Sequence, residues 1–293
     1  MNWIFLTLIA MVLWAVVNII DKHVVSADLR DEISVTRIFG LIMSLCFIAI
    51  AFIFEPRVLS KAFSLSAFLG GFIYTIALWF YYYVMRREEV SRFVPAGGLE
   101  PIFASVAAFF LFQEQYEFIN YFGMFLAIVG VMLISYKKHT RKIKSKHLIV
   151  FIVIAIFLFV VRNLLFKYSS VQGHDFWVTM FWAGIGSLFL PLIFTFLPHP
   201  RLRSRGWAGV KHLAVAAVLS SIALVCFTKA IIVGSVSLSS AVLATKPLLV
   251  FVLVLILSKF SPKIISESFT HKVLVQKAIA IVIIVAGGVL IVT

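Results

Sequence analysis

Charged residues are scarce in this chain of 293 residues, because only 13% are Asp, Glu, Lys or Arg. A soluble domain has about 25% charged and about 45–50% apolar residues. Here 62% of the residues are hydrophobic and the mean hydropathy is +1.10. A water-soluble fold cannot bury so much apolar surface. The composition therefore excludes a soluble globular protein and predicts a chain whose solvent is lipid.

Cysteine and recognisable catalytic motifs are also scarce. The two cysteines, Cys46 and Cys226, fall inside apolar runs, so we expect small core residues rather than a disulfide. No CxxC or HExxH motif occurs, and the seven histidines have no partner at metal-ligand spacing. We therefore expect no metal, no cofactor and no enzyme. Without a GxxxxGK[ST] motif, a pump that hydrolyses ATP by itself is also disfavoured.

Basic residues outnumber acidic residues, 26 to 12, for a formal net charge of +14. They lie in short loops between apolar runs, which is typical of membrane topology signals and not of a nucleic-acid-binding surface. We therefore expect no nucleic acid partner. Alternate loops carry eighteen Lys and Arg on one side and four on the other. By the positive-inside rule this places the basic loops in the cytoplasm and both termini outside.

Ten apolar runs come close to the roughly 20 residues that a spanning helix needs. They cover residues 2–20, 33–54, 62–85, 93–112, 118–136, 148–168, 176–197, 212–232, 236–258 and 273–292. Only Gly234-Ser235 separates the eighth run from the ninth. The predicted fold is an all-α integral membrane protein with ten transmembrane helices.

The chain contains an internal repeat. Residues 81–101 are echoed by residues 227–247 at a constant shift of 146, which aligns Glu100 with Lys246. A shift of 145 likewise aligns Asn18, in the first predicted helix, with Asn163 in the sixth.

These matches predict two five-helix halves, residues 1–136 and 148–293, joined by a basic linker at 137–147. Five is an odd number, so the halves are expected to be inverted in the membrane, which is a transporter architecture.

The order of these features resembles the EamA-like family of ten-helix transporters in the drug/metabolite transporter superfamily. The matching features are the helix start at 14–22, Arg37, REEVSRFVPAGGLEPIF at 87–103, Glu114, Gly123 and Gly130. The resemblance implies export of small metabolites through a cavity built by helices one to four and six to nine, with helices five and ten peripheral. The chain departs from the family in two ways: the family has cytoplasmic termini, and Glu267 lies about seven residues later than the repeat predicts.

Glu100 and Lys246 are the central candidate site residues. A charge at the centre of a span costs about 2.5–3.5 kcal/mol, so each is expected to face the bundle interior. They either pair with each other or face the substrate, and Glu100, as the one acid deep in a predicted span, is the candidate proton carrier. Arg37 and Arg162 either snorkel to an interface or add to a positive surplus that attracts an anion.

Other candidates are polar, aromatic or helix-breaking residues within the predicted spans. Asn18 and Asn163 either bridge helices or touch substrate. Pro101 and Pro247 each remove a helical hydrogen bond, which makes either a static kink or a hinge. The aromatic candidates for the cavity wall are Trp14, Tyr74, Trp79, Tyr82 and Trp182.

These features predict a secondary transporter that exports a small polar, preferably anionic, metabolite across a prokaryotic plasma membrane by alternating access. Protons are the candidate coupling ion, and we expect a monomer or homodimer. A flippase for a lipid-linked sugar or headgroup is a rival within transport. A membrane receptor or structural protein that transports nothing is the rival from another class.

Overall fold

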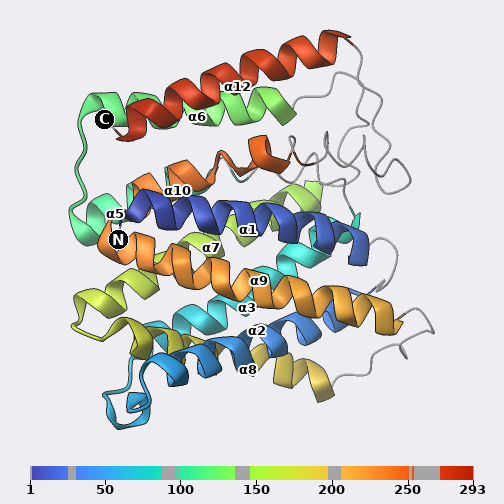
Figure 1. The fold of residues 1–293 in the computed structure, drawn as a ribbon, viewed down its shortest axis with the longest axis vertical. Coiled ribbons are helices and arrows are strands. Elements are labelled where there is room, and N and C mark those ends of the chain that lie inside the picture. Colours follow the sequence, from blue (N-terminus) through green and yellow to red (C-terminus); the bar gives the residue numbers. More distant parts are fainter. Residues whose placement is uncertain are drawn as a thin grey trace.

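The structure, a computed structural model, describes residues 2–25, 31–87, 97, 99–135, 146–196, 206–250, 253 and 271–292 (Figure 1). Every regular element in these residues is helical, which confirms the all-α prediction. The elements are α1 (Trp3–His23), α2 (Glu32–Phe54), η2 (Val58–Ser60), α3 (Leu65–Arg87), α5 (Glu100–Phe112), α6 (Phe118–Ser135), α7 (Lys146–Val171), α8 (Phe176–Phe196), α9 (Gly206–Val233), α10 (Val236–Leu243) and α12 (His271–Val292).

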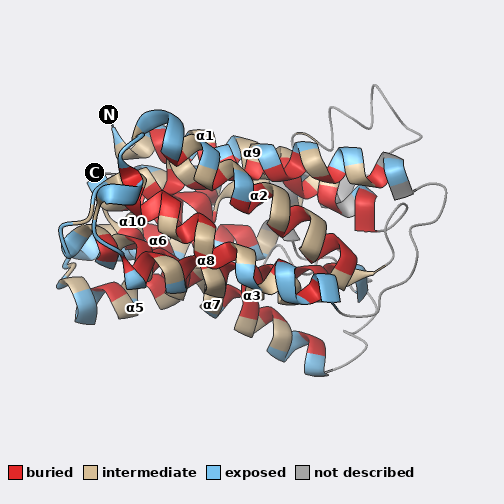
Figure 2. Cartoon of the chain, turned by 90° about the horizontal axis from the view of Figure 1, so that it is seen from below, coloured by how far each residue is buried: buried red, intermediate tan, exposed pale blue. Residues whose placement is uncertain are grey.

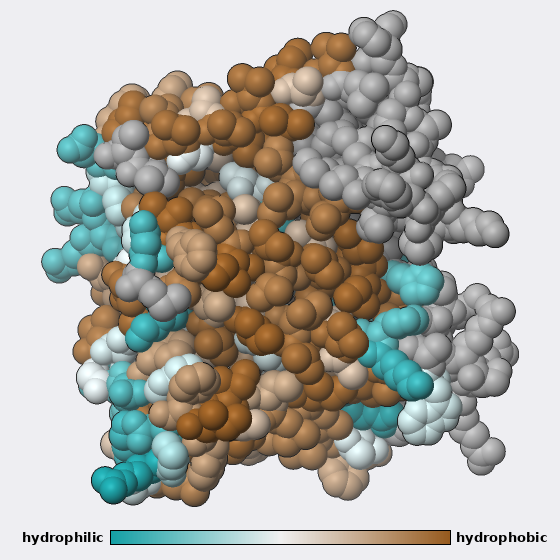
Figure 3. Space-filling view, in the orientation of Figure 1, coloured by the Kyte–Doolittle hydropathy of each residue, from teal (hydrophilic) through white to brown (hydrophobic). Residues whose placement is uncertain are grey.

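Six of these helices, α1, α2, α3, α7, α8 and α9, are long and apolar enough to cross a bilayer. Shorter apolar stretches of 10–17 residues lie in α5, in α6, in α12 and from the start of α10 to Val250, counted within the described residues. Apolar surface covers the middle of the helices, and hydrophilic residues lie towards their ends (Figure 3). The chain is therefore a multi-pass helical membrane protein, and the number of ten spans stays a prediction. The predicted linker lies outside the described residues, except for the two residues that open α7.

The predicted bounds of the fourth and ninth spans both meet a proline. The fourth span is expected from residue 93; residues 93–96 and 98 lie outside the described residues, and α5 begins at Glu100, so that Pro101 lies in its first turn. The ninth span was expected to run unbroken from residue 236, whereas α10 ends at Leu243 and the helix resumes at Lys246. The ring of Pro247 would clash with the carbonyl four residues earlier, which is that of Leu243.

The short turn between α9 and α10 is confirmed. α9 ends at Val233, and α10 begins at Val236. Ser235 is the N-cap, and its Oγ accepts a hydrogen bond of 3.1 Å from the backbone N–H of Leu238. This cap satisfies a backbone donor that would otherwise lack a partner, so two residues are enough to reverse the chain. The eighth helix begins earlier than predicted, at Gly206 instead of residue 212.

Helices from the two halves of the chain interleave. α3 packs against α7 and α1 against α9, while α3 also packs against α8 and α2 against α9. In the predicted repeat, α1 corresponds to α7, α2 to α8 and α3 to α9. When corresponding helices are exchanged, the α3–α7 pairing becomes α9–α1, and the α3–α8 pairing becomes α9–α2. α6 and α12 pack on each other at one edge of the bundle, as the resemblance implies, and the two chain ends lie at the same end of the helices (Figure 1).

Buried residues line the inner faces of the helices (Figure 2). Helix pairs come closest where glycine removes the side chain. A Cβ on Gly71 of α3 would overlap the backbone of Ala183 in α8, and a Cβ on Gly186 of α8 would overlap the backbone of Phe68 in α3. The α3–α8 crossing is therefore a backbone-to-backbone contact that fixes how the helices around the core are placed.

Candidate functional site

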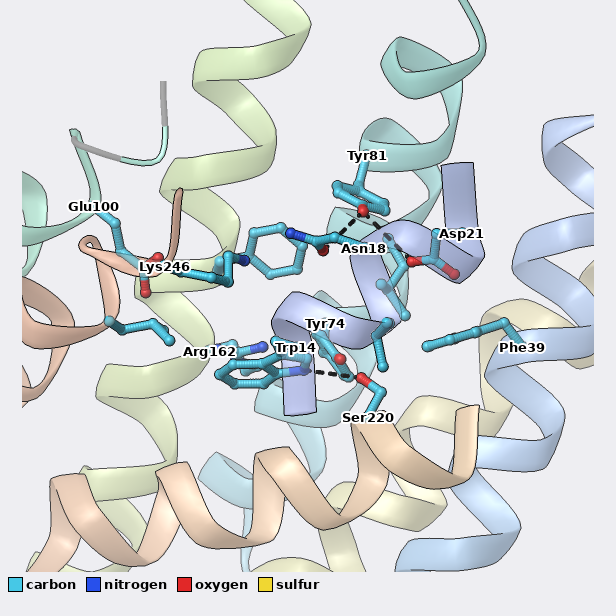
Figure 4. Close-up of a pocket in the computed structure, with 14 residues that line it drawn as sticks. Trp14, Asn18, Asp21, Phe39, Tyr74, Tyr81, Glu100, Arg162, Ser220 and Lys246 are labelled. Carbon is cyan, nitrogen blue, oxygen red and sulfur yellow. Dashed lines mark hydrogen bonds between the residues drawn. The ribbon is translucent and has the colours of Figure 1, made fainter. Parts of the chain in front are cut away.

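A cavity of about 100 Å³ lies between the two halves of the chain (Figure 4). By the measure that a buried water needs about 10–15 Å³, it has room for several waters. Its lining residues are Trp14, Val17, Asn18, Asp21, Phe39, Tyr74, Leu78, Tyr81, Glu100, Phe159, Arg162, Ser220, Leu243 and Lys246. A second cavity shares Asn18, Tyr81, Glu100 and Lys246 with it and extends to Met85 and Gly97. The combined space therefore reaches towards the end of the bundle opposite the termini.

Six of the predicted site residues meet in this cavity, although they come from five separate stretches of the chain. They are Trp14, Asn18, Tyr74, Glu100, Arg162 and Lys246. Several lining residues also correspond at the shift of 145 or 146. These pairs are Trp14 with Phe159, Val17 with Arg162, Tyr74 with Ser220, and Glu100 with Lys246. Equivalent positions of the two halves therefore face one space.

Glu100 and Lys246 both line the cavity, but no direct ion pair within 4.0 Å joins them among the described residues. Glu100 instead accepts a hydrogen bond of 3.1 Å from the Asn163 side-chain amide. The Asn163 carbonyl oxygen in turn accepts bonds from Arg162, of 3.0 Å from Nε and 2.6 Å from Nη2. Asn163 is fully buried and thus bridges a cation and a carboxylate from behind the cavity wall.

Arg162 is held over aromatic rings. Its guanidinium carbon lies 4.6 Å from the centre of the Tyr74 ring and 5.3 Å from that of Phe159. Arg162 is only 3% exposed, so it does not snorkel to the surface of the protein. Ring faces attract a cation most strongly where water is excluded, so the stacking stabilises a charge that is otherwise costly to bury.

The cavity wall continues with Trp14, which donates a hydrogen bond of 3.0 Å from Nε1 to Oγ of Ser220. The two residues come from α1 and α9, which pair across the halves. Tyr82 is fully buried beside the cavity, where its hydroxyl donates to Asp21 at 3.2 Å. Trp79 and Trp182 are not among the lining residues, and Arg37 is half-buried on α2 outside the lining.

Neither predicted hinge proline interrupts a continuous helix. Pro101 occupies the first turn of α5, where a missing N–H costs no helical hydrogen bond. Pro247 follows the break at Ala244 and Thr245 and opens the next helical segment. Among the described residues, Pro191 does lie inside a long helix, α8, and it faces Gly40 of α2.

Asp21 is a cavity residue that the sequence interpretation missed. Glu100 is expected to be the one acid deep in a span, and a second buried acid accompanies it in the cavity, because Asp21, at the end of the first candidate span, is 2% exposed and lines the cavity. The signal was present, since Asp21 follows Asn18 by three residues and so shares its helix face. With Arg37 outside the lining, the charged lining residues are two acids, Asp21 and Glu100, and two bases, Arg162 and Lys246. The predicted surplus of two positive charges is therefore absent from the described cavity wall.

A second polar cluster, which we call the Glu114 cluster, consists of Glu114, Tyr116, Lys167, Ser235 and Ser237. Glu114 forms an ion pair of 2.5 Å with Lys167 and accepts hydrogen bonds from Tyr116 at 2.6 Å, Ser237 Oγ at 2.8 Å and Ser235 Oγ at 2.9 Å. It also accepts from the backbone N–H of Val236, at the start of α10. The cluster lies near the end of the bundle where the termini are, away from the Met85 and Gly97 side of the cavity (Figure 1).

Contacts within the Glu114 cluster shift the pKa values of two of its members, Glu114 and Tyr116. Burial alone opposes ionisation of Glu114, but the hydrogen bonds from Lys167, Tyr116 and Ser237 outweigh it and lower the pKa of the Glu114 carboxyl to about 2. Burial and the bond to Glu114 raise the pKa of the Tyr116 phenol. Negative charge at the N-terminus of α10 is also favoured by the helix dipole. The sequence singled out Glu114 through the family resemblance, but nothing in it indicated that Glu114 meets Lys167.

The fold and site define a polytopic membrane protein with a polar, charged cavity between two interleaved halves. Residues 1–136 match the family model of the EamA-like transporter family, which lies within the drug/metabolite transporter superfamily. The resemblance recognised in the sequence is thus confirmed for the first half of the chain, and transport across a membrane is the activity that this family suggests. No curated protein matches the chain.

The fold has counterparts among solved structures. The crystal structure of another protein superposes with a TM-score of 0.74 at 15% sequence identity, covering 98% of this chain and 95% of that chain. At this identity the likeness concerns the fold alone. It extends over both halves, including the half beyond the family match.

Proposed function

We propose that the protein is a secondary transporter that exports a small polar metabolite across the plasma membrane by alternating access, with two inverted five-helix halves. The observation that carries this proposal is the cavity between the halves, where equivalent positions of both contribute side chains. In inverted-repeat transporters the substrate site lies at the repeat interface near the midplane. The symmetric exchange of helix pairings, α3–α7 with α1–α9 and α3–α8 with α2–α9, supports the inverted arrangement.

The division of charge in the cavity bears on the substrate. The first half supplies both carboxylates, Asp21 and Glu100, and the second half supplies both cations, Arg162 and Lys246. A lining without surplus charge attracts a simple anion less than the sequence suggested. It favours a solute that is neutral or carries charges of both signs, which can contact both halves at once.

Lys246→Met is expected to abolish transport, because it removes one of the two cationic groups from the cavity while keeping the length of the side chain. The measurement is solute flux in proteoliposomes loaded with a panel of amino acids, organic acids and phosphorylated metabolites. Lys229→Met is the matched control, since Lys229 lies over the Phe176 ring at 4.7 Å and is not a lining residue. It makes the same chemical change within a helix and should retain flux.

Three results would contradict the proposal. If the folded wild type moved no member of the panel, a lipid-linked substrate would have to be considered instead. Equal flux in Lys246→Met and wild type would mean that the cavity is not part of the transport path. Selective flux of simple anions alone would contradict the balanced-charge interpretation of the lining.

A further inference from the structure

Asp21 differs from the other charged groups of the cavity in the kind of partners it has. Its carboxylate accepts hydrogen bonds from two phenols, Tyr82 at 3.2 Å and Tyr81 at 3.4 Å. No ion pair to Asp21 exists within the part of the chain that the structure describes. Two neutral donors therefore hold a carboxylate that is 2% exposed.

Glu100 has the opposite surroundings on the other side of the same cavity. Its partner Asn163 is bonded to Arg162, and Lys246 lines the cavity beside it. Cations close by stabilise the ionised form of a carboxylate. Glu100 is thus linked to a cation through Asn163, which makes it a weaker candidate than Asp21 for taking up and releasing a proton.

The other titratable groups around Asp21 do not neutralise it. From α3 these are Tyr74, Tyr81 and Tyr82, and Lys246 faces it across the cavity as the one lining cation besides Arg162. On α1 itself, His23 is exposed and packs edge-on against His212 at the exposed start of α9, with ring centres 5.7 Å apart. Hydrogen bonds from neutral phenols only partly compensate a buried charge, whereas uptake of a proton removes the charge altogether.

We propose that Asp21 is the proton-binding site of this protein, and that Tyr81 links its protonation to the substrate cavity. The Tyr81 hydroxyl lies 3.4 Å from Oδ2 of Asp21 and 3.4 Å from Oδ1 of Asn18. A hydroxyl has a single proton to donate, so it serves one of these acceptors at a time. With Asp21 ionised, Tyr81 donates to it and leaves the Asn18 carbonyl oxygen for the substrate. With Asp21 protonated, Tyr81 turns to Asn18 and occupies that acceptor.

This assignment deepens the proposed function and rests on it for its role in transport, but protonation itself can be measured without any substrate. Infrared spectra of the full-length protein in lipid, recorded across neutral pH, reveal a buried carboxylic acid through its C=O stretching band. We expect a band in wild type that disappears in Asp21→Asn and persists in Glu100→Gln. Both substitutions remove one buried carboxyl and preserve side-chain shape, so each is the control for the other.

A second variant keeps the test decisive if Asp21→Asn fails to fold. Tyr82→Phe removes one hydrogen-bond donor to the ionised Asp21 carboxylate, so the protonated form of Asp21 becomes more populated at a given pH. A hydrogen bond to a charged group is worth about tenfold in an equilibrium constant, and the band should persist to a pH about one unit higher. A band that is absent from wild type, or that depends on Glu100 and not on Asp21, would overturn the assignment.

Flux separates this assignment from the proposed function. If the wild type transports, a pH gradient should accelerate flux in wild type and have no effect on Asp21→Asn. If nothing is transported but the infrared band depends on Asp21, the proton site stands and the proposed function fails. Flux that keeps its pH dependence in Asp21→Asn would show that the coupling proton binds elsewhere.

Discussion

Gly71→Ala is expected to be one of the two most destabilising methyl additions to a described helix glycine, together with Gly186→Ala on the other side of the same crossing. The added Cβ would fall on the carbonyl of Ala183, and backbone in a packed helix cannot rotate away as a side chain can. The helices would have to move apart, with loss of the contacts along the α3–α8 crossing. Overpacking of a core costs about 1–3 kcal/mol, and a clash with backbone belongs at the upper end of that range.

The measurement is the thermal unfolding midpoint of purified protein in detergent. Gly288→Ala in α12 is the matched control, because a Cβ there would meet nothing within 4 Å. Replacement of glycine by alanine in an open helical position stabilises by roughly 0.5–1 kcal/mol, so this variant should melt at or slightly above wild type. If the two variants melted together, the backbone contact between α3 and α8 would not be the determinant of this part of the fold.

Glu114→Gln is the second change with a large expected effect. It removes the negative charge of the carboxylate. This carboxylate is contacted by Lys167, Tyr116, Ser235, Ser237 and the N-terminus of α10. The ion pair is largely buried, with side-chain exposures of 13% for Lys167 and 9% for Glu114. Removal of one partner leaves the other charge uncompensated, and the loss of stability is expected to be on the order of 3 kcal/mol.

Two further variants make this result specific. Glu117→Gln makes the same charge change at an exposed position three residues away and should leave the melting temperature unchanged. Adding Lys167→Met to Glu114→Gln removes the stranded ammonium, so the double variant should recover part of the loss. A double variant as unstable as the sum of the two single variants would mean that the groups act independently.

The pH dependence of stability has a definite sign here. The pKa of Glu114 is lowered from 4.5 to about 2, so its stabilising contribution is complete above the unfolded pKa of 4.5 and is lost as pH falls towards 2. Wild type should therefore lose more stability than Glu114→Gln on acidification through this window. Parallel acid melting curves for the two proteins would contradict that expectation.

The sequence alone determined that the protein lies in lipid, that it is helical, and which residues supply much of the cavity wall. Apolar content dictated lipid and helices, because backbone polar groups in a bilayer must be satisfied within the segment. The internal repeat, at a shift of 145 or 146 residues, then singled out Glu100, Lys246, Asn18 and Asn163. Of these, Glu100, Lys246 and Asn18 line the cavity, and Asn163 stands directly behind it.

Only the tertiary structure decided which charged groups meet. Asp21 directly follows the first predicted span, and α3 brings Tyr81 and Tyr82 to it at the cavity. Glu114 and Lys167 are 53 residues apart and become partners where α7 passes the start of α10. Helix periodicity tells which residues share a face, but it does not tell which face of another helix lies opposite. That choice depends on where two backbones can approach, and here it was made by crossings such as the one at Gly71 and Ala183.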